Sequence, residues 1–288
     1  MKEIVVLSGK GGTGKTSITA ALASVAQDAV FCDNDVDAAD LHLLLQPQVK
    51  EKNVFLSAWL AEIDQEKCTG CSLCVDYCRF DAIHSDAEGR LAVNPFQCEG
   101  CKLCEKVCPS GAITSKQSDK NHWFISDTRF GTLVHARMGP GEENSGKLVT
   151  EVRRQAMNQA TAQGRSYLLN DGPPGIGCTV ISSLTGANVV LLVIEPTLSG
   201  WHDASRLIEL IKTFGMPTYA VINKYDINTE VADDIASSLA ALSIPLLEKI
   251  PFEKAMVDAM TSGKTIVEYA PDGGIAKQIK KVWKTLSA

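Results

Sequence analysis

Eight of the ten cysteines in the chain lie in two runs of identical spacing, CxxCxxCxxxC. The runs comprise Cys68, Cys71, Cys74 and Cys78, and then Cys98, Cys101, Cys104 and Cys108. Thiolates two residues apart on a tight loop can bind successive corners of an iron–sulfur cube, and the fourth cysteine of such a run reaches the neighbouring cube. The spacing predicts two [4Fe-4S] clusters. We call their expected ligands set 1 (Cys68, Cys71, Cys74 and Cys108) and set 2 (Cys98, Cys101, Cys104 and Cys78).

A pair of zinc sites is the alternative, because four thiolates also suit tetrahedral zinc. Zinc ribbons usually present two CxxC pairs separated by a long gap, so the third closely spaced cysteine favours iron–sulfur clusters. The phrases CTGCSLCVDYC and CEGCKLCEKVC, with Pro109 after the last cysteine, resemble the bacterial two-cluster ferredoxins. Arg79 stands where that family usually has proline. This departure concerns the surroundings of Cys78 and leaves ligation itself in place.

A second group of residues is suited to phosphate binding. The apolar stretch Ile4 to Leu7 leads into GxxxxGKT, and small and apolar residues follow. In such a loop the glycines let backbone N–H groups face the phosphates, the lysine supplies a fixed cation and the threonine hydroxyl reaches Mg²⁺. The expected nucleotide-binding residues here are Gly11, Gly12, Thr13, Gly14, Lys15, Thr16 and Ser17.

The loop carries an additional lysine, Lys10, and its sequence KGGTGKT resembles the deviant phosphate loop of the MinD/ParA-type ATPases. The nitrogenase iron protein and the Mrp-type cluster carriers are also related to that family. The resemblance implies that Lys10 crosses the interface of an ATP-bound homodimer and contacts the phosphates bound to the partner subunit. Lys10, Lys15 and Asp35 are then the expected catalytic residues.

Further segments of the chain resemble motifs of the same family. Asp35 lies in a DxD-like segment and would position the attacking water or help to hold Mg²⁺, whereas its neighbours Asp33 and Asp37 are weaker candidates. DGPPG resembles the family's DxPPG: Asp171 would act on Mg²⁺ through a water, and Gly175 would be the switch glycine. The expected magnesium site thus comprises Thr16, Asp35 and Asp171.

Two segments near the C-terminal end of the pattern resemble base-contacting loops. Asn223 follows an apolar stretch and would read the adenine amino group, and Pro251 and Phe252 resemble the last such loop of the family. NKYD also resembles the NKxD of GTPases, in which case Asp226 would pair with guanine. The family analogy favours ATP over GTP.

Apolar stretches that alternate with helical segments must position these residues. Strands are expected at Ile4 to Leu7, Ala29 to Cys32, Tyr167 to Asn170, Val189 to Ile194 and Thr218 to Ile222. This alternation predicts an α/β fold with a doubly wound, mostly parallel sheet, whose ligand lies at the carboxyl ends of the strands. The cysteine segment interrupts it as a small α+β, bacterial-ferredoxin-like insertion. The expected domains are 1–59 with 117–288 and the inserted 60–116.

Composition excludes several classes of protein. The 288 residues include 45% hydrophobic side chains and carry a net charge of −6, so the chain is expected to be globular, with no direct signal for nucleic-acid binding. Its N-terminus reads as a first strand and not as a signal peptide, and its clustered thiols fit a cytoplasmic protein. The remaining cysteines, Cys32 and Cys178, are expected to be buried. The five histidines show no ligand spacing.

Two more segments carry alternative interpretations. GPGEENSGK precedes a helix expected at Leu148 to Thr161; it is either a loop with Asn144 or Ser145 as N-cap or part of the nucleotide or dimer interface. The C-terminal stretch from Ile275 is a short basic amphipathic helix. We expect it to pack against the sheet and not to bind a membrane, although membrane contact is the alternative.

The combination leaves three classes of function. The first is an ATPase whose nucleotide state controls electron transfer through two [4Fe-4S] clusters, with an unidentified redox protein as partner; cluster potentials or transfer rates would then differ between ATP and ADP states. The second is a metallocluster carrier or assembly ATPase, with a labile cluster and a cluster-accepting partner. The third is a positioning ATPase of the MinD/ParA type, in which the clusters sense redox state or serve as structural elements. The first is favoured narrowly.

Overall fold

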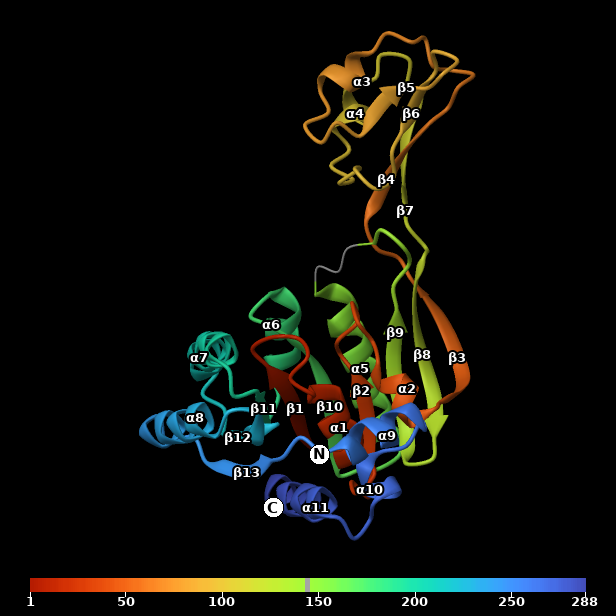
Figure 1. Ribbon diagram of the computed structural model, residues 1–288. Coiled ribbons are helices and arrows are strands. Elements are labelled where there is room, and N and C mark those ends of the chain that lie inside the picture. Colours follow the sequence, from red (N-terminus) through yellow and green to blue (C-terminus); the bar gives the residue numbers. More distant parts are fainter. Residues whose placement is uncertain (143–145) are drawn as a thin grey trace. The chain divides into compact units, whose positions relative to one another are not determined.

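A nine-stranded sheet organises most of the computed structural model, which describes residues 1–142 and 146–288 (Figure 1). In spatial order its strands are β13 (Leu246–Ile250), β12 (Thr218–Asn223), β11 (Val189–Ile194), β1 (Lys2–Ser8), β10 (Tyr167–Pro174), β2 (Ala29–Asp33), β9 (Gly131–Arg137), β8 (Asn121–Thr128) and β3 (Gln48–Phe55). The strands from β13 to β9 pair in parallel. The predicted doubly wound, mostly parallel sheet is confirmed.

Helices cover both faces of this sheet because its central strands are apolar on both sides. In β1, Ile4 and Val6 pack into the core of one face, whereas Val5 and Leu7 pack into the core of the other. The first face carries α1 (Lys15–Ala23), α2 (Leu41–Leu45), α9 (Lys254–Thr261), α10 (Ile266–Tyr269) and α11 (Gly274–Ser287). The second carries α5 (Lys147–Ala162), α6 (Cys178–Leu184), α7 (Leu198–Lys212) and α8 (Thr229–Ala241), with the short 3₁₀ helix Tyr225–Ile227 before α8.

The described chain divides into two compact units. One comprises Met1–Lys52, Trp123–Ala136 and the chain from Gly146 onward; the other comprises Asn53–His122 and the short segment that begins at Arg137. The second unit contains the whole segment expected as an insertion, and it begins earlier and ends later than residues 60–116. The difference arises because β3, β8 and β9, which the apolar pattern did not reveal, extend the main sheet on either side of the insertion.

The inserted unit contains two short antiparallel strand pairs and two short helices. The pairs are β4 (Trp59–Ile63) with β7 (Ile113–Gln117) and β5 (Ile83–Ser85) with β6 (Leu91–Val93), and the helices are α3 (Leu73–Asp76) and α4 (Leu103–Val107). Each helix lies within one cysteine run. The repeat also appears in the backbone, since Gly70 and Gly100 have φ values of +70° and +63°. Positive φ at matching positions gives both runs the same tight loop.

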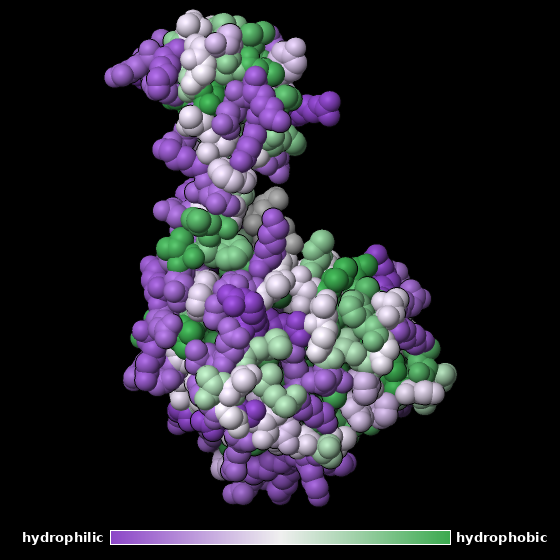
Figure 2. All heavy atoms as spheres, turned by 180° about the vertical axis from the view of Figure 1, so that it is seen from behind, coloured by the Kyte–Doolittle hydropathy of each residue, from purple (hydrophilic) through white to green (hydrophobic). Residues whose placement is uncertain are grey.

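The C-terminal helix α11 packs against the sheet, as predicted. Its apolar residues Ile275, Ile279, Val282 and Leu286 are at most 1% exposed. They belong to the main core on the face that also holds α1. The lower edge of the molecule, where α11 lies in Figure 1, carries hydrophilic side chains in the view of Figure 2. The face that could have inserted into a lipid surface is therefore used for folding.

The two isolated cysteines differ in their surroundings. Cys32 is buried in β2, as predicted, and its thiol lies 3.0 Å from the Asn34 side-chain oxygen. The prediction that Cys178 is buried is wrong, because this residue is exposed. It is the first residue of α6 and lies on the exposed face of this helix, whereas Val180 and Leu184 lie on the buried face.

The remaining predictions concern a helix, a loop and the histidines. The helix expected at Leu148 to Thr161 is α5, and the proposed N-caps Asn144 and Ser145 lie outside the described residues. His135 is buried in the core and stacks on His42 and Phe124. Burial, with His42 nearby, lowers the pKa of His135 to about 4, so it is neutral at pH 7. No helix among the described residues has the length and apolar character needed to cross a membrane.

Candidate functional site

The phosphate loop joins β1 to α1 at the carboxyl edge of the sheet. Gly12 and Gly14 adopt φ values of +79° and +87°, which side chains other than glycine rarely accept. A Cβ atom on Gly14 would lie only 2.3 Å from the Asn223 side-chain nitrogen. That nitrogen donates a 2.7 Å hydrogen bond to the Thr13 carbonyl, so the base loop supports the phosphate loop. The Thr13 hydroxyl is buried without a protein partner, as expected of a group that faces a ligand.

Lys15 and two carboxylates form the polar centre of the site. The Lys15 ammonium lies 2.9 Å from Asp171 Oδ1 and 3.4 Å from Asp35 Oδ2. Burial lowers the pKa of Lys15, but attraction to Asp171 and Asp35 outweighs burial and the net pKa is raised. Thr16 and Thr19 donate hydrogen bonds of 2.7 and 2.8 Å to the Asp171 carboxylate. The expected magnesium residues Thr16, Asp35 and Asp171 are thus brought together around one lysine.

The three aspartates of the DxD-like segment differ in their roles. Asp33 is fully buried and its carboxylate accepts the backbone N–H groups of Asp35 and Leu41, so it holds the turn after β2. Asp35 faces the nucleotide cleft described below. Burial raises the pKa of Asp35 to about 6, although Lys15 opposes the shift. Asp37 is exposed and does not line the cleft. Only Asp35 is placed for chemistry.

A cleft of about 460 Å³ continues from the phosphate loop to the ends of β12 and β13. Its volume suits a small-molecule ligand. One end is polar and contains the phosphate loop with Lys15 and Asp35. The other end is largely apolar and is lined by Asn223, Pro251, Phe252, Met256, Val257 and Met260. The expected base residues Asn223 and Pro251 therefore lie in the same cleft as the phosphate loop, and the methionines and Val257 of α9 add apolar surface that the motifs did not predict.

The switch glycine Gly175 lies immediately after β10. Its N–H donates a 3.0 Å hydrogen bond to the Ser8 carbonyl at the end of β1, and its φ is +87°. The amide is thus engaged within the sheet edge. It can reach a γ-phosphate only after this hydrogen bond breaks, which requires the DGPPG loop to move.

Lys10 is not among the residues that line the cleft in the described chain. Its ammonium lies 3.0 Å from Glu195 Oε2, and it also donates to the hydroxyls of Thr197 and Ser199. Glu195 and Thr197 lie between the end of β11 and the start of α7, and Ser199 lies in the first turn of α7. Sequence reasoning missed Glu195 as a site residue. The signal available was its position at the carboxyl end of a predicted strand, where ligands of parallel sheets bind.

The eight clustered cysteines surround two separate cavities in the inserted unit. One cavity is lined by all four cysteines of set 1 together with Leu73 and Leu91. The other is lined by all four cysteines of set 2 together with Tyr77 and Phe80. The cysteine grouping thus follows the crossed pattern, in which Cys78 and Cys108 each join the other run.

Backbone hydrogen bonds explain this crossing. The N–H of Asp64, just before the first run, donates to the Ala112 carbonyl, just after the second run, at 2.8 Å. In the same way the N–H of Asn94 donates to the Ala82 carbonyl at 2.7 Å. A backbone hydrogen bond therefore joins the segment after each run to the segment before the other run. The N–H groups of Ala82 and Ala112 also donate to the sulfurs of Cys78 and Cys108, at 3.4 and 3.3 Å.

The four cysteines of each set line one cavity. In the part of the chain that the structure describes, no three His, Cys, Asp or Glu side chains are grouped so as to hold a metal ion. A tetrahedral zinc site requires four ligands within about 2.3 Å of one centre. A cubane cluster keeps its four thiolates farther apart, because four iron atoms and four sulfides lie between them.

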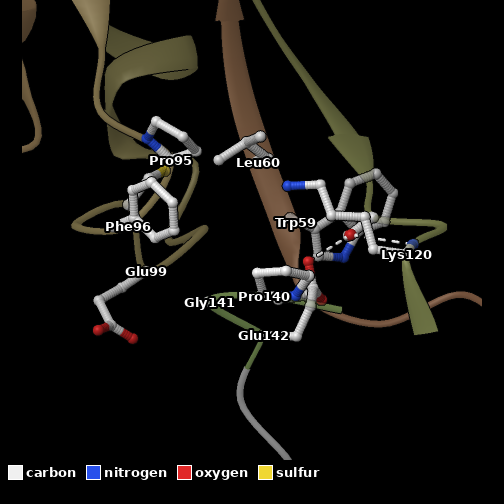
Figure 3. A pocket seen from close by; sticks show the side chains of 12 residues that line it. Trp59, Leu60, Pro95, Phe96, Glu99, Lys120, Pro140, Gly141 and Glu142 are labelled. Carbon is white, nitrogen blue, oxygen red and sulfur yellow. Dashed lines mark hydrogen bonds between the residues drawn. The ribbon is translucent and has the colours of Figure 1, made fainter. Parts of the chain in front are cut away.

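Another cavity of the inserted unit lies beside set 2 and is drawn in Figure 3. Pro95 and Phe96 lie on one side of it and Trp59 and Lys120 on the other. The Glu142 carboxylate accepts hydrogen bonds from the hydroxyls of Ser57 and Ser118, at 2.6 and 2.5 Å. Ser57 precedes β4 and Ser118 follows β7. Glu142 therefore links the residues that flank β4 and β7, the paired strands at the two ends of the inserted unit.

The fold and the cleft define a P-loop nucleotide-binding protein built on a doubly wound sheet. The family model of the CobQ/CobB/MinD/ParA nucleotide binding domain matches residues 4–266. The chain therefore belongs to this MinD/ParA family. An uncharacterized protein of Methanocaldococcus jannaschii is 33% identical over 229 residues, which cover 78% of this chain and 79% of that protein. The septum site-determining protein MinD of Synechocystis is 22% identical over 275 residues, 92% of this chain and 81% of that one.

Solved structures show the same fold. The septum site-determining protein MinD of Pyrococcus horikoshii, in complex with Mg-ADP, superposes with a TM-score of 0.59 at 18% identity, covering 99% of this chain and 95% of that one. An ATP complex of Cyanothece McdA also has a TM-score of 0.59, at 16% identity, covering 99% and 96%. These matches support the nucleotide-binding unit of the fold.

Proposed function

We propose that the protein hydrolyses ATP in the cleft between the phosphate loop and α9, and that hydrolysis drives a nucleotide-dependent switch. The observation that carries this proposal is that Lys15, Thr16 and Asp35 line the polar end of a cleft whose other end suits a base. The buried Asp171 carboxylate contacts Lys15 and Thr16 behind them. Backbone N–H groups of Gly11 to Thr16 and the Lys15 ammonium would bind the phosphates. Asp35 would orient the attacking water.

Magnesium is the metal that this chemistry requires, and the residues present fit it. The Thr16 hydroxyl and the Asp35 carboxylate supply hard oxygen donors at the polar end of the cleft, as Mg²⁺ prefers. The buried Asp171 carboxylate accepts the Thr16 hydroxyl, so it would act on the cation from behind this residue. The bound cation would neutralise charge on the β and γ phosphates. The Lys15 ammonium balances part of the negative charge of Asp35 and Asp171.

The base end of the cleft favours adenine over guanine. The Asn223 side-chain nitrogen is occupied by the Thr13 carbonyl, so its oxygen is the atom left to contact a base. That oxygen accepts the amino group of adenine, whereas guanine presents a carbonyl at the same position. One carboxylate oxygen of Asp226 accepts the Phe252 N–H at 2.7 Å, and Asp226 does not line the cleft in the described chain. This arrangement argues against the GTPase alternative.

A homodimer formed around ATP would complete the site, with Lys10 of each subunit contacting the phosphates in its partner. We expect Lys10→Ala to bind ATP with nearly unchanged affinity as a monomer, because Lys10 does not line its own cleft. The dimer dissociation constant in a nonhydrolysable ATP analogue should rise at least about tenfold, since a charge-assisted contact to each nucleotide is lost. Sedimentation with Mg²⁺ and the analogue, against ADP, measures this change.

Lys212→Ala, a lysine at the end of α7, is a matched control that removes the same charge away from the cleft. It should dimerise like the wild type. A Lys10→Ala variant that dimerises as tightly as the wild type would contradict the shared site. A wild-type protein that binds neither ATP nor ADP would contradict the proposed function as a whole.

We further propose that the inserted unit binds two [4Fe-4S] clusters, one held by set 1 and the other by set 2. The support is that each set of four cysteines lines one cavity. When bound, such clusters supply one-electron redox chemistry. The chain's own contribution is to hold the thiolates and to direct backbone N–H groups at Cys78 and Cys108, which stabilises negative charge on sulfur. Reduced thiols of this kind also favour a cytoplasmic location.

The comparisons favour the positioning ATPase class, since relatives and solved structures include MinD proteins. The cysteine cavities are the observation that keeps ATP-controlled electron transfer as a second candidate, with an unidentified redox protein as partner. A metallocluster carrier, with a cluster-accepting partner, is less favoured because both ligand sets are complete, which argues against a labile cluster.

One measurement separates the first two classes. If nucleotide state and clusters are coupled, anaerobic ATPase turnover should change severalfold between dithionite-reduced and oxidised protein, because a coupling free energy of about 1 kcal/mol corresponds to about fivefold. A variant lacking one thiolate of a set, such as Cys74→Ser, should reduce the difference in turnover between the reduced and oxidised protein. Equal turnover in both redox states would favour the positioning ATPase, whose clusters would then be structural.

A further inference from the structure

Lys10, the lysine expected to act in the partner subunit, is held by its own subunit in this structure. Its ammonium has three partners, namely the Glu195 carboxylate at 3.0 Å and the hydroxyls of Thr197 and Ser199 at 3.1 and 3.3 Å. The Lys10 side chain is 27% exposed and the Glu195 side chain 16% exposed. An ion pair with this degree of burial is less screened by water than a fully exposed one.

Glu195 also joins Lys10 to the base end of the cleft. Its second oxygen, Oε1, accepts a 2.8 Å hydrogen bond from the Lys224 ammonium. Lys224 donates in turn to the Gly12 carbonyl at 2.9 Å. Lys224 adopts a left-handed backbone conformation with φ of +55°, directly after Asn223. One carboxylate therefore binds both Lys10 of the phosphate loop and Lys224, which contacts the same loop.

The charge state of Glu195 supports these contacts. Burial raises its pKa, but the hydrogen bonds from Lys224 and Lys10 outweigh burial, and the net pKa lies below the usual value for glutamate. The carboxylate is therefore ionised at neutral pH. Two cations face one anion, and Thr197 supplies a further fixed acceptor because it caps α7 through a 2.9 Å hydrogen bond from Gly200.

We propose that Glu195 is a positioning residue that retains Lys10 in its own subunit and thereby sets how readily two ATP-bound subunits associate. This inference rests on the proposed dimer. Before Lys10 can extend to a partner's phosphates, its ion pair with Glu195 and its two hydroxyl contacts must break. Their free energy opposes association once in each protomer. The contact thus keeps the resting protein monomeric until ATP supplies a stronger anion for Lys10.

Glu195→Gln tests this role, because the amide keeps the shape of the side chain and removes its charge. We expect the dissociation constant of the dimer with Mg²⁺ and a nonhydrolysable ATP analogue to fall about fivefold, since two ion pairs, one per protomer, need not be broken. Sedimentation equilibrium measures that constant directly. ADP affinity of the monomer, measured by calorimetry, should change less than about twofold, since Glu195 does not line the cleft.

Two controls separate this role from a general effect on the phosphate loop. Lys224→Met removes the other lysine partner of Glu195 and its contact to Gly12; tighter dimerisation in this variant as well would overturn the inference, because the effect would then arise from the loop. Glu209→Gln removes one exposed negative charge of α7. Equal tightening by Glu209→Gln would likewise overturn it, since net charge alone would explain the result.

The outcomes also distinguish this inference from the dimer proposal. A wild-type protein that dimerises, with Glu195→Gln no tighter, overturns the role of Glu195 and leaves the dimer standing. If wild type and variant both stay monomeric, the dimer proposal fails and this inference fails with it. A wild type that dimerises weakly and a Glu195→Gln variant that dimerises more tightly, with no tightening in either control, support the retention of Lys10.

Discussion

Asp35→Asn is expected to reduce ATP hydrolysis at least about 100-fold while ATP binding persists. Asp35 is the carboxylate of the DxD-like segment that faces the cleft, 3.4 Å from the Lys15 ammonium. The amide keeps its size but can neither carry the negative charge that orients an attacking water nor bind Mg²⁺ equally well. Because hydrolysis would stall after ATP binding, the ATP-bound dimer should accumulate. Steady-state phosphate release and sedimentation with ATP measure the two effects.

The pH dependence of hydrolysis independently tests whether the ionised Asp35 carboxylate is required. Burial raises the pKa of Asp35 to about 6, so the carboxylate is protonated below and ionised above that pH in the nucleotide-free protein. If the ionised form is required, kcat/KM should rise with pH through about 6 and then level off. In Asp35→Asn the residual rate should lose this rise.

Asp37→Asn is the matched control, because Asp37 belongs to the same segment but is exposed and does not line the cleft. It should retain hydrolysis within about twofold. An Asp35→Asn enzyme with wild-type turnover would show that another group orients the water. Equal losses in the two variants would point to disturbance of the whole turn after β2.

Serine substitution of paired cysteines is expected to distinguish the crossed sets from two sets taken run by run. The wild type, purified anaerobically, should contain about eight iron atoms per chain. Cys74→Ser with Cys108→Ser removes two ligands of set 1 and should leave about four iron atoms. Cys104→Ser with Cys108→Ser removes one ligand from each set and should leave markedly fewer. Iron and sulfide analysis, with electron paramagnetic resonance of the reduced protein, measures both.

The two double variants serve as controls for each other, since each removes two cysteines of the same small unit. The opposite order, with about four iron atoms in Cys104→Ser/Cys108→Ser and few in Cys74→Ser/Cys108→Ser, would show that each run binds its own cluster. Zinc in place of iron in the wild type would refute the cluster proposal entirely. ATP binding should be unaffected in both double variants, because the nucleotide cleft contains no cysteine among its described lining residues.

Much of the nucleotide-binding unit could be predicted from local pattern. Apolar runs bounded by glycine and aspartate predicted the central strands, because strands buried on both faces must be continuously apolar. β1, β2, β10, β11 and β12 were found where these runs lie. The same pattern missed β3, since Gln48–Phe55 (QVKEKNVF) has a run of charged residues in its middle and lies mostly exposed at the edge of the sheet. An edge strand is stabilised by its neighbour more than by burial, so its sequence carries a weaker signal.

The sequence alone determined the local loops that carry the clustered cysteines and the glycines. Both describe short stretches of backbone, where a few neighbouring residues decide the conformation. The phosphate loop and the two repeated cysteine loops are of this kind, and Lys15 and Thr16 follow from their place in the first of them. Asn223 depended instead on a family resemblance.

Only the tertiary structure decided the partners of charged groups. Asp33, Asp35 and Asp37 are alike in sequence, yet burial and backbone contacts give Asp33 a structural role and leave Asp35 facing the cleft. Glu195 meets Lys10 and Lys224 only because β11 lies between β1 and β12 in the sheet. Electrostatic contacts act across space between residues far apart in the chain, and the order of the strands determines which of them become neighbours.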